Sequence, residues 1–381
     1  MPWCSTCVRT GALDRVKESI CYPAALMSPR RRPIVGVTNW DPADDNQYLD
    51  RLTSALRSEG IAVLPVRLAP LRIAFKAALG MRAVHVHWPE YLVRPFNRSR
   101  ADAALNGVRL ARVAAGLAAC RLLRVRVVWT VHNLGPHEAH ASWAAFRAYA
   151  LVARFADVVV AHSRAAARRA QARFPRARER TLVAPHGNYL GAHPPARTPR
   201  AELRARYGVP DDAFLLLAFG QVRAYKRLAE LSRAVAAMNG VNAHVLIAGA
   251  ALEDGLAGEL ESVATGSDRV HLDLRRVPAD EVAALHDAAD AAVFNHAELF
   301  SSGALLLALS QGLAVITARS DAASEVAPWP AVTGFAGEAE LLEAMQRLRA
   351  VDPAVRRAAA IDAARAASWE RAAAALRGAY G

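Results

Sequence analysis

The sequence contains few cysteines and no long apolar run. Its four cysteines include one Cys-x-x-Cys pair, Cys4 and Cys7, but no second ligand pair follows at the spacing of a zinc site. No run approaches the roughly 20 apolar residues that a membrane-spanning helix needs. Residues 1–30 lack the continuous apolar segment of a secretory signal. We therefore expect no metal site, and a cytoplasmic protein that can still contact a membrane surface.

Two common nucleotide-binding signatures are also missing. The sequence has no Walker lysine pattern and no Gly-x-Gly-x-x-Gly, which disfavours ATP and NAD. It has no RNA-binding signature and no helix-turn-helix pattern, so nucleic acid is not an expected partner. The formal net charge is nevertheless +13, a balance that attracts phosphorylated substrates and anionic lipid surfaces.

The length of 381 residues exceeds what one hydrophobic core supports, roughly 250–300 residues, so two domains are expected. Residues 1–32 are expected to form a poorly ordered leader, and Met27 offers an alternative start. From Pro33 the chain alternates between apolar stretches and helix-length stretches. Strands are predicted at 34–38, 61–66, 83–88, 126–131 and 157–162, and helices at 46–57, 101–123 and 143–155.

A proline-rich linker, marked by Pro194, Pro195 and Pro199, precedes a second series of the same kind. There, strands are predicted at 214–219, 243–248, 270–274, 291–295 and 314–317, helices at 227–238, 252–265, 279–288 and 303–311, and a helical tail at 338–380. This alternation predicts an α/β fold of two Rossmann-like, doubly wound parallel-sheet domains, residues 33–200 and 201–381. Ligands of such sheets bind beyond the carboxyl ends of the strands, which would face each other across a cleft.

Polar residues follow two predicted strands of the first domain. His87 and Glu90 come where one strand ends, and Pro89 forces a turn between them. The next cluster, residues 129–138, ends another strand and carries two histidines, His132 and His137. It also carries Asn133 and Glu138. Transfer of a group to a hydroxyl needs a base, which Glu138 or His137 could supply, whereas His132 could contact the donor.

Two clusters of the second domain suit a phosphate. Gly220 lets a ligand approach the backbone, and Arg223 and Lys226 bring two cations to the same strand–helix turn. Ser302 and Gly303 begin a predicted helix, where exposed backbone N–H groups bind anions. A solvated turn and a simple helix cap are the alternative interpretations.

The arginine-rich stretch 164–180 is expected to be a solvated helix face or a contact with anionic lipid. Residues 71–79 suit a shallow interfacial helix, because Ile73 and Phe75 lie beside Arg72 and Lys76.

On these clusters the sequence resembles the bacterial GDP-mannose:glycolipid 4-β-D-mannosyltransferases of exopolysaccharide assembly, the xanthan-pathway type. The matching stretches are 85–92, 130–138, 186–189, 219–226 and 302–310. The resemblance implies a GT-B fold, no cofactor or obligatory metal, and inversion at the anomeric carbon. It implies a sugar-nucleotide donor, GDP-mannose, and a lipid-linked oligosaccharide acceptor held at the anionic inner face of the plasma membrane. The cluster His132 to Glu138 would then face the acceptor.

Retaining GT-B families carry a pair of glutamates around the helix that begins at Gly303. Here the second position falls at Leu307 and the first near Leu299, which argues against a typical retaining enzyme.

We therefore expect a glycosyltransferase whose base is Glu138, with His137, Asp41 and Asp45 as alternatives. Arg223, Lys226, Ser302 and Gly303 would hold the donor diphosphate, and His87, Glu90, Asn133 and Asn46 would line the acceptor side. A retaining or UDP-sugar-dependent GT-B enzyme stays open as an alternative. So does a non-catalytic sugar-nucleotide-binding component of a polysaccharide assembly complex.

Overall fold

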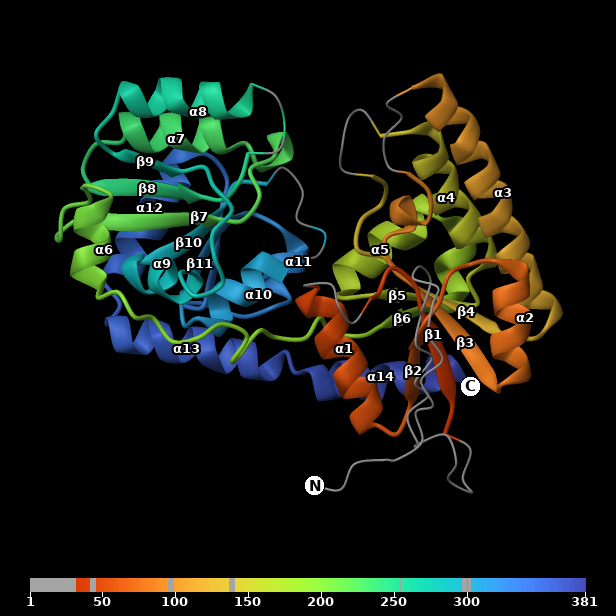
Figure 1. Ribbon diagram of the computed structural model, residues 1–381. Coiled ribbons are helices and arrows are strands. Elements are labelled where there is room, and N and C mark those ends of the chain that lie inside the picture. The colour runs from red at the N-terminus through yellow and green to blue at the C-terminus, as the bar shows by residue number, and fades with distance from the viewer. Residues whose placement is uncertain are drawn as a thin grey trace, which may run out of the picture. The chain divides into compact units, whose positions relative to one another are not determined.

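A computed structural model describes residues 32–381, except residues 42–45, 95–98, 137–140, 252, 254, 297–299, 301 and 302. Within residues 33–381, two six-stranded parallel sheets are each covered by helices on both faces (Figure 1). The α/β fold of two Rossmann-like units predicted from the sequence is therefore confirmed.

The first sheet has the strand order β2-β1-β3-β4-β5-β6. Its strands are β1 (Ile34–Val37), β2 (Ala62–Pro65), β3 (Met81–Val86), β4 (Arg126–Thr130), β5 (Val158–Ala161) and β6 (Thr181–Val183). Its helices are α1 (Gln47–Ser58), α2 (Pro70–Ala78), α3 (Arg100–Leu122), α4 (Trp143–Phe155) and α5 (Arg164–Arg173), with 3-10 turns η2 (Pro89–Leu92) and η3 (Pro175–Arg180).

Side chains along each strand of the first sheet alternate between two hydrophobic cores. Val127 and Trp129 of β4 pack with helices α2, α3, α4 and α5, whereas Val128 packs with α1 on the other face. This period of two is what a parallel strand buried on both faces requires, because successive side chains point to opposite faces.

The second sheet has the order β12-β11-β10-β7-β8-β9. Its strands are β7 (Phe214–Phe219), β8 (Ala243–Ala248), β9 (Val270–Asp273), β10 (Ala291–Phe294), β11 (Val315–Ala318) and β12 (Val332–Phe335). Helices α6 (Arg200–Arg206), α9 (Val282–Ala288), α10 (Gly303–Ser310) and α13 (Pro353–Ala366) contribute to one core. Helices α7 (Leu228–Ala237), α8 (Leu256–Thr265) and α12 (Glu338–Arg349) contribute to the other.

The structure also contains the 3-10 turn η4 (Ala224–Lys226), the short helix α11 (Asp321–Ser324) and, at the C-terminus, α14 (Trp369–Arg377) and the 3-10 turn η5 (Gly378–Tyr380).

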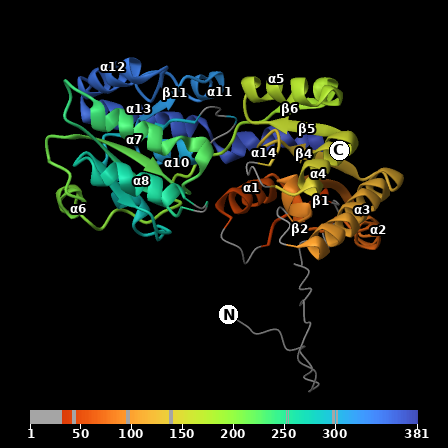
Figure 2. The ribbon, with the colours of Figure 1, turned by 90° about the horizontal axis from the view of Figure 1, so that it is seen from above.

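The C-terminal helices divide between the two sheets. Ala360 and Ala364 of α13 belong to a core of the second sheet, whereas Trp369 and Leu376 of α14 are buried with α1 against the first sheet. Figure 2 shows α13 and α14 following one another along the chain's last segment. The sequence prediction assigned all of 201–381 to the second domain. The structure differs, because the apolar face of α14 finds its core on the first sheet.

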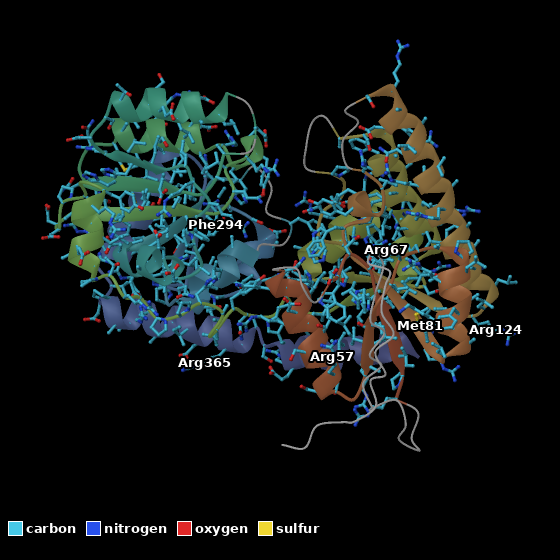
Figure 3. All side chains as sticks on the ribbon, viewed as in Figure 1. Arg57, Arg67, Met81, Arg124, Phe294 and Arg365 are labelled. Carbon is cyan, nitrogen blue, oxygen red and sulfur yellow. The ribbon has the colours of Figure 1, made fainter. Side chains whose placement is uncertain are left out.

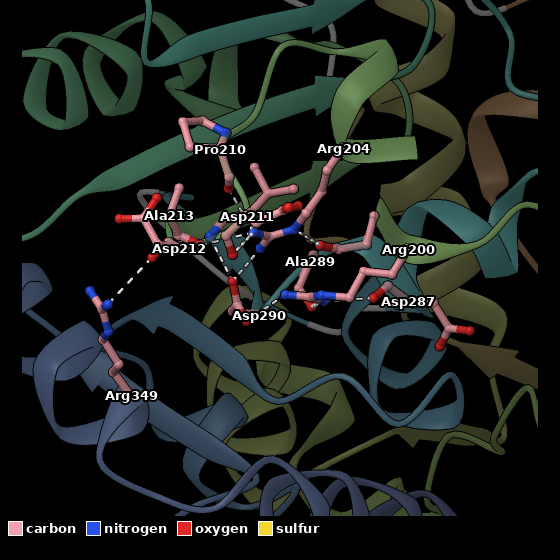
Figure 4. A network of polar contacts seen from close by, with 12 residues as sticks. Arg200, Arg204, Pro210, Asp211, Asp212, Ala213, Asp287, Ala289, Asp290 and Arg349 are labelled. Carbon is pink, nitrogen blue, oxygen red and sulfur yellow. Dashed lines mark hydrogen bonds and ion pairs between the residues drawn. The ribbon is translucent and has the colours of Figure 1, made fainter. Parts of the chain in front are cut away.

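A buried arginine ties the connecting segment to the second sheet. Arg204 of α6 is 1% exposed and pairs with Asp290 at 2.7 Å. Its guanidinium also donates to the carbonyl oxygens of Ala288, Pro210, Asp211 and Ala213 at 2.9–3.1 Å (Figure 4). A buried guanidinium needs all of these acceptors to offset its desolvation, so the network fixes where the second unit begins.

The sequence contains no uninterrupted apolar run long enough to span a membrane, but helix α3 passes a looser test of length and average hydropathy. By length and composition it is the one helix among the described residues that could cross a membrane, with 28% of its most apolar window buried. One face of α3 packs against the first sheet through Val113, Leu117 and Cys120.

Candidate functional site

Four neighbouring strands of the first sheet are each followed by a buried or half-buried histidine. His87 follows β3, His132 follows β4, His162 follows β5 and His186 follows β6. Because these strands are parallel and adjacent, the histidines lie along the carboxyl edge of the sheet in the same order. We call these four residues the histidine row.

Hydrogen bonds fix the orientation of the imidazole rings. His87 Nδ1 and His132 Nε2 share a hydrogen bond of 3.0 Å. His162 Nδ1 donates to the carbonyl oxygen of Ala184 at 3.0 Å, and His186 Nδ1 donates to that of Gly187 at 2.7 Å. Because a carbonyl oxygen only accepts, the two Nε2 atoms of His162 and His186 carry lone pairs when the rings are neutral.

Tyr48 of α1 joins the row. Its ring lies 4.8–5.8 Å, centroid to centroid, from all four histidine rings in edge contacts. The Tyr48 hydroxyl lies 3.3 Å from His162 Nε2, to which it can donate. Burial raises the pKa of Tyr48 well above its usual value, so the hydroxyl keeps its proton.

The histidine row is uncharged at neutral pH. Burial lowers the pKa of His162 to about 4 and that of His186 to about 3, the neighbouring His162 adding to the second effect. Burial and the adjacent imidazoles hold the pKa values of His87 and His132 well below their usual range. The row therefore offers single donors and acceptors rather than cations. No group of three or more metal-ligating side chains is placed to bind a metal within the described residues.

The other residues predicted for the acceptor side have separate environments. Glu90 is buried in η2 beside Tyr149, whose pKa is raised by burial and then by that carboxylate, and Asn133 lies near the same hydroxyl. Asn46 caps α1, because its side-chain oxygen accepts from the backbone N–H of Leu49 at 3.2 Å. In the structure the Asn46 side chain therefore serves as the N-cap of α1.

Several predicted residues fall outside the described part of the chain. These are Glu138, His137, Asp45 and Ser302. Asp41, one of the alternative bases, is described and exposed.

The predicted phosphate turn follows β7 and contains two close approaches. Gly220 has a φ of +96°, and a Cβ atom on Gly249 would lie 2.3 Å from the Gly220 carbonyl oxygen. A Cβ atom on Gly220 would in turn lie 3.6 Å from Lys226 Nζ. Position 249 therefore has no space for a side chain, and the positive φ at position 220 favours glycine. The Lys226 amine lies close to Gly220, the first residue of the turn.

The two predicted cations of this turn are not equivalent. Lys226 is buried, and burial followed by the Arg223 charge lowers the pKa of Lys226 to about 8. Arg223 lies 3.7 Å from the Glu253 carboxylate. Together they give a positive turn beside an open glycine backbone, as an anionic ligand requires.

Helix α10 begins beside the histidine row. A Cβ atom on Gly303 would lie 3.0 Å from the Tyr189 hydroxyl oxygen and 3.6 Å from His186 Nε2. The strand before α10 is β10, which pairs with β7, and Asn295 at its end donates to the carbonyl oxygen of Arg227 at 3.1 Å. The start of α10 therefore contacts the end of the histidine row, and β10, the strand before α10, pairs with β7, the strand before the Lys226 turn.

Two other contacts join α5 to the second half of the chain. The Glu325 carboxylate accepts from the backbone N–H groups of Arg164 and Ala165 at 2.6 and 2.8 Å, which caps α5. Phe300 is buried with the core of the first sheet, under the guanidinium of Arg169.

Sequence reasoning missed His162, Tyr48 and Gly249, and it quoted His186 without giving it a role. The signal was available for His162, which ends the strand predicted at 157–162, whereas His186 follows β6, a strand that the sequence did not predict. Tyr48 lies in a helix and gave no such signal.

Comparisons with known proteins bear on the fold. No protein-family model and no curated protein matches the chain. Solved structures that match include sucrose-phosphate synthase from Thermosynechococcus elongatus, with a TM-score of 0.64 and 19% identity over 92% of this chain and 98% of that one. HepE of Anabaena in complex with UDP-glucose matches with a TM-score of 0.61 and 17% identity over 91% and 98% of the two chains.

A third match is WaaG, a glycosyltransferase involved in lipopolysaccharide biosynthesis, with a TM-score of 0.59 and 17% identity over 91% of this chain and 100% of that one. At these identities the likeness shows the fold alone. The chain has the GT-B fold that the family resemblance implied, with the two Rossmann-like parts predicted from the sequence.

Proposed function

We propose that this protein is a glycosyltransferase that moves a sugar from a sugar nucleotide to a hydroxyl of an acceptor. One observation carries the proposal. A buried lysine with a depressed pKa, Lys226, lies against the glycine turn after β7, while helix α10, after the adjacent strand β10, begins against the histidine row. The fold neighbours add support, since HepE is described with UDP-glucose and WaaG as a glycosyltransferase.

The leaving group is the part of the reaction that this site suits best. The acceptor oxygen attacks the anomeric carbon, the bond from that carbon to the diphosphate oxygen breaks, and the diphosphate leaves with the electron pair. Lys226 and Arg223 would neutralise the charge that develops on that oxygen. The open backbone at Gly220 and the start of α10 at Gly303 would let the diphosphate approach closely.

The acceptor proton must go to a base on the side of the first sheet. Glu138 is our first choice, with His137, Asp41 and Asp45 as alternatives. His132 lies at the end of the adjacent strand β4 and is neutral, which suits a contact with a hydroxyl rather than with a phosphate. Within this proposal the histidine row orients hydroxyl groups, and a carboxylate accepts the proton.

The donor is proposed to be GDP-mannose, transferred with inversion. This rests on the resemblance of residues 85–92, 130–138 and 219–226 to the exopolysaccharide mannosyltransferases and on the missing glutamate at Leu307. A UDP-sugar is the second candidate, favoured by the UDP-glucose complex of HepE.

The acceptor is proposed to be a lipid-linked oligosaccharide at the inner face of the plasma membrane. Among the described residues, fourteen large apolar side chains are exposed, and ten of them lie between Leu71 and Phe146. These ten belong to α2, η2, α3 and α4 or directly follow α2 or α3. Between Gly60 and Thr130 the sequence has twelve lysines and arginines but only two acids, Glu90 and Asp102, and both acids are buried.

Helices α2, α3 and α4 pack on the same face of the first sheet, so these side chains lie on the outside of one helical layer. Figure 3 shows Arg124, just after α3, at the margin of this layer. Exposed apolar groups among cations, with no exposed carboxylate among the described residues of that stretch, suit an anionic bilayer surface.

A donor screen tests the proposed reaction. The protein is incubated with labelled GDP-mannose, UDP-glucose and other sugar nucleotides, together with a bacterial membrane lipid extract. Transfer of label from one donor to the lipid fraction is expected, and the anomeric configuration of the product, measured by NMR, separates inversion from retention. Nucleotide binding without transfer or donor hydrolysis would contradict catalysis and favour a sugar-nucleotide-binding component of a polysaccharide assembly complex.

Vesicle sedimentation tests the membrane surface separately. Vesicles that contain phosphatidylglycerol are expected to bind the wild-type protein, and Leu71→Ser combined with Phe75→Ser should release it. Val355→Ser, which changes another exposed apolar residue, on α13, is the control and should bind as the wild type does. Equal binding of both variants would contradict this surface.

A further inference from the structure

The segment from His186 to Tyr189 contains two polar side-chain atoms without a hydrogen-bond partner among the described residues. His186 donates from Nδ1 to the carbonyl oxygen of Gly187, so Nε2 of the neutral ring carries a lone pair. The residue is only 9% exposed. The Tyr189 hydroxyl is the second atom. A Cβ atom on Gly303 would lie 3.6 Å from the first and 3.0 Å from the second, so both atoms face the start of α10.

This segment is held rigidly. The Trp369 indole donates to the carbonyl oxygen of Asn188 at 2.6 Å, and Asn188 Nδ2 donates to the carbonyl oxygen of Ala364 at 2.9 Å. The backbone N–H of Tyr189 donates to Ser310 Oγ at 2.9 Å, which places the tyrosine along α10. Two side chains fixed in this way are preorganised for a ligand, because binding orders little that is not already ordered.

With Nδ1 donating to the Gly187 carbonyl oxygen, neutral His186 suits a hydroxyl better than a phosphate at Nε2. A phosphate oxygen only accepts hydrogen bonds, and it would meet a lone pair at Nε2. A hydroxyl group can donate to that lone pair, and the Tyr189 hydroxyl can donate to or accept from a neighbouring hydroxyl. Two adjacent hydroxyls are what a hexose presents.

We propose that His186 Nε2 and the Tyr189 hydroxyl bind hydroxyl groups of the transferred sugar and so discriminate a sugar nucleotide from the bare nucleotide. This inference rests on the proposed function, which places the diphosphate at Lys226 and at the start of α10. The sugar attached to that diphosphate would then lie against the end of the histidine row, between the leaving group and the acceptor side.

Calorimetric titration with matched ligands tests the inference. GDP and GDP-mannose, and UDP and UDP-glucose, are each titrated into the wild-type protein and into Tyr189→Phe and His186→Phe. Each variant removes hydrogen-bonding atoms and keeps a ring of similar size. Affinity for the sugar nucleotide is expected to fall about fivefold in each variant, the effect of one lost hydrogen bond, while affinity for the nucleoside diphosphate stays within about twofold.

The controls separate the possible failures. His193→Gln changes a half-buried histidine of the same connecting segment and should leave both affinities unchanged. Should His186→Phe fail to fold, as judged by its melting temperature, Tyr189→Phe alone decides the matter, because it removes only one oxygen. Equal losses for both ligands, or no loss for either, would overturn the sugar contact alone. Failure of the wild type to bind any of the four ligands would overturn the proposed function together with this inference.

Discussion

The amine of Lys226 lies 3.6 Å from the point that a Cβ atom on Gly220 would occupy. The lysine that ends η4 therefore reaches back to the first residue of the turn after β7. No carboxylate of the described residues pairs with Lys226, whereas Arg223 shares its charge with Glu253. Lys226 is thus the cation of this turn that an incoming anion can use without displacing a carboxylate. The affinity for an anionic ligand should therefore depend on the protonation of Lys226.

Nucleotide affinity should fall at alkaline pH because Lys226 loses its charge there. Burial and the Arg223 charge lower the pKa of Lys226 to about 8, so the cation is present below this pH and is lost as pH rises through it. Calorimetric titration of the better-binding diphosphate, GDP or UDP, at pH 7, 8, 9 and 9.5 should show a progressive loss of affinity. Lys226→Arg keeps a cation over this whole range and should remove most of the dependence. The same loss in Lys226→Arg would assign the titration to another group.

Acid should destabilise the fold through the buried histidines. Burial lowers the pKa of His85 and His186 to about 3 and that of His162 to about 4. The unfolded chain takes up protons near pH 6.5, so the stabilisation is complete above that pH and is lost as pH falls toward 3–4. Each such histidine contributes about 1.4 kcal/mol per pH unit to the free energy of unfolding in that range.

Urea unfolding at pH 7, 6 and 5 measures this slope. His162→Gln, which removes one titrating ring, should reduce the slope by about one proton. A free energy of unfolding that does not change between pH 7 and 5 would show that the row is open to water.

Gly187→Ala should strongly destabilise the protein. A Cβ atom there would lie 2.0 Å from Trp369 Cδ2, inside the indole ring that packs on this backbone. Overpacking of this kind costs about 3 kcal/mol, measured by urea unfolding. Gly107→Ala in α3 is the matched control, because nothing lies within 4 Å of the added atom, and a helical alanine should stabilise by up to about 1 kcal/mol. Equal effects of the two substitutions would contradict the contact between residue 187 and Trp369.

Arg204→Met should also lower the free energy of unfolding, by about 3 kcal/mol. The substitution leaves four backbone carbonyls and the partly buried Asp290 with fewer donors (Figure 4). Arg357→Gln removes another arginine that pairs with an aspartate, Asp287 at 3.1 Å, but both side chains of this pair are well exposed. That control should change stability by less than about 0.5 kcal/mol. A small effect at Arg204 would mean that water replaces the guanidinium.

The fold could be predicted because apolar stretches of strand length recur at helix-length intervals. The strands at 214–219 and 243–248 and the helix at 143–155 have the predicted bounds. β6 and β12 were missed, since β6 has only three residues after an arginine-rich segment and β12 contains Gly334. The packing of α14 on the first sheet could not be predicted, because an apolar helix face does not specify which sheet it will cover.

The site was predicted only in part. Gly220 and Lys226 lie close together as expected, because one short turn contains both. The contact of His186 and Tyr189 with Gly303 joins residues more than 110 positions apart, and only the tertiary structure reveals it. The sequence also gave no indication that Glu253 competes for Arg223 or that the histidines are neutral, since both depend on packing.

Binding of nucleoside diphosphates to variants of the glycine turn tests the central claim most directly. GDP and UDP are titrated into the wild type, Lys226→Met and Arg223→Met, with melting temperatures as the control for folding. At least one nucleotide should bind the wild type, and each variant should bind it at least about tenfold more weakly, the effect of a lost charge-assisted hydrogen bond. Unchanged affinity in both folded variants would contradict a diphosphate at Lys226, and with it the glycosyl transfer proposed here.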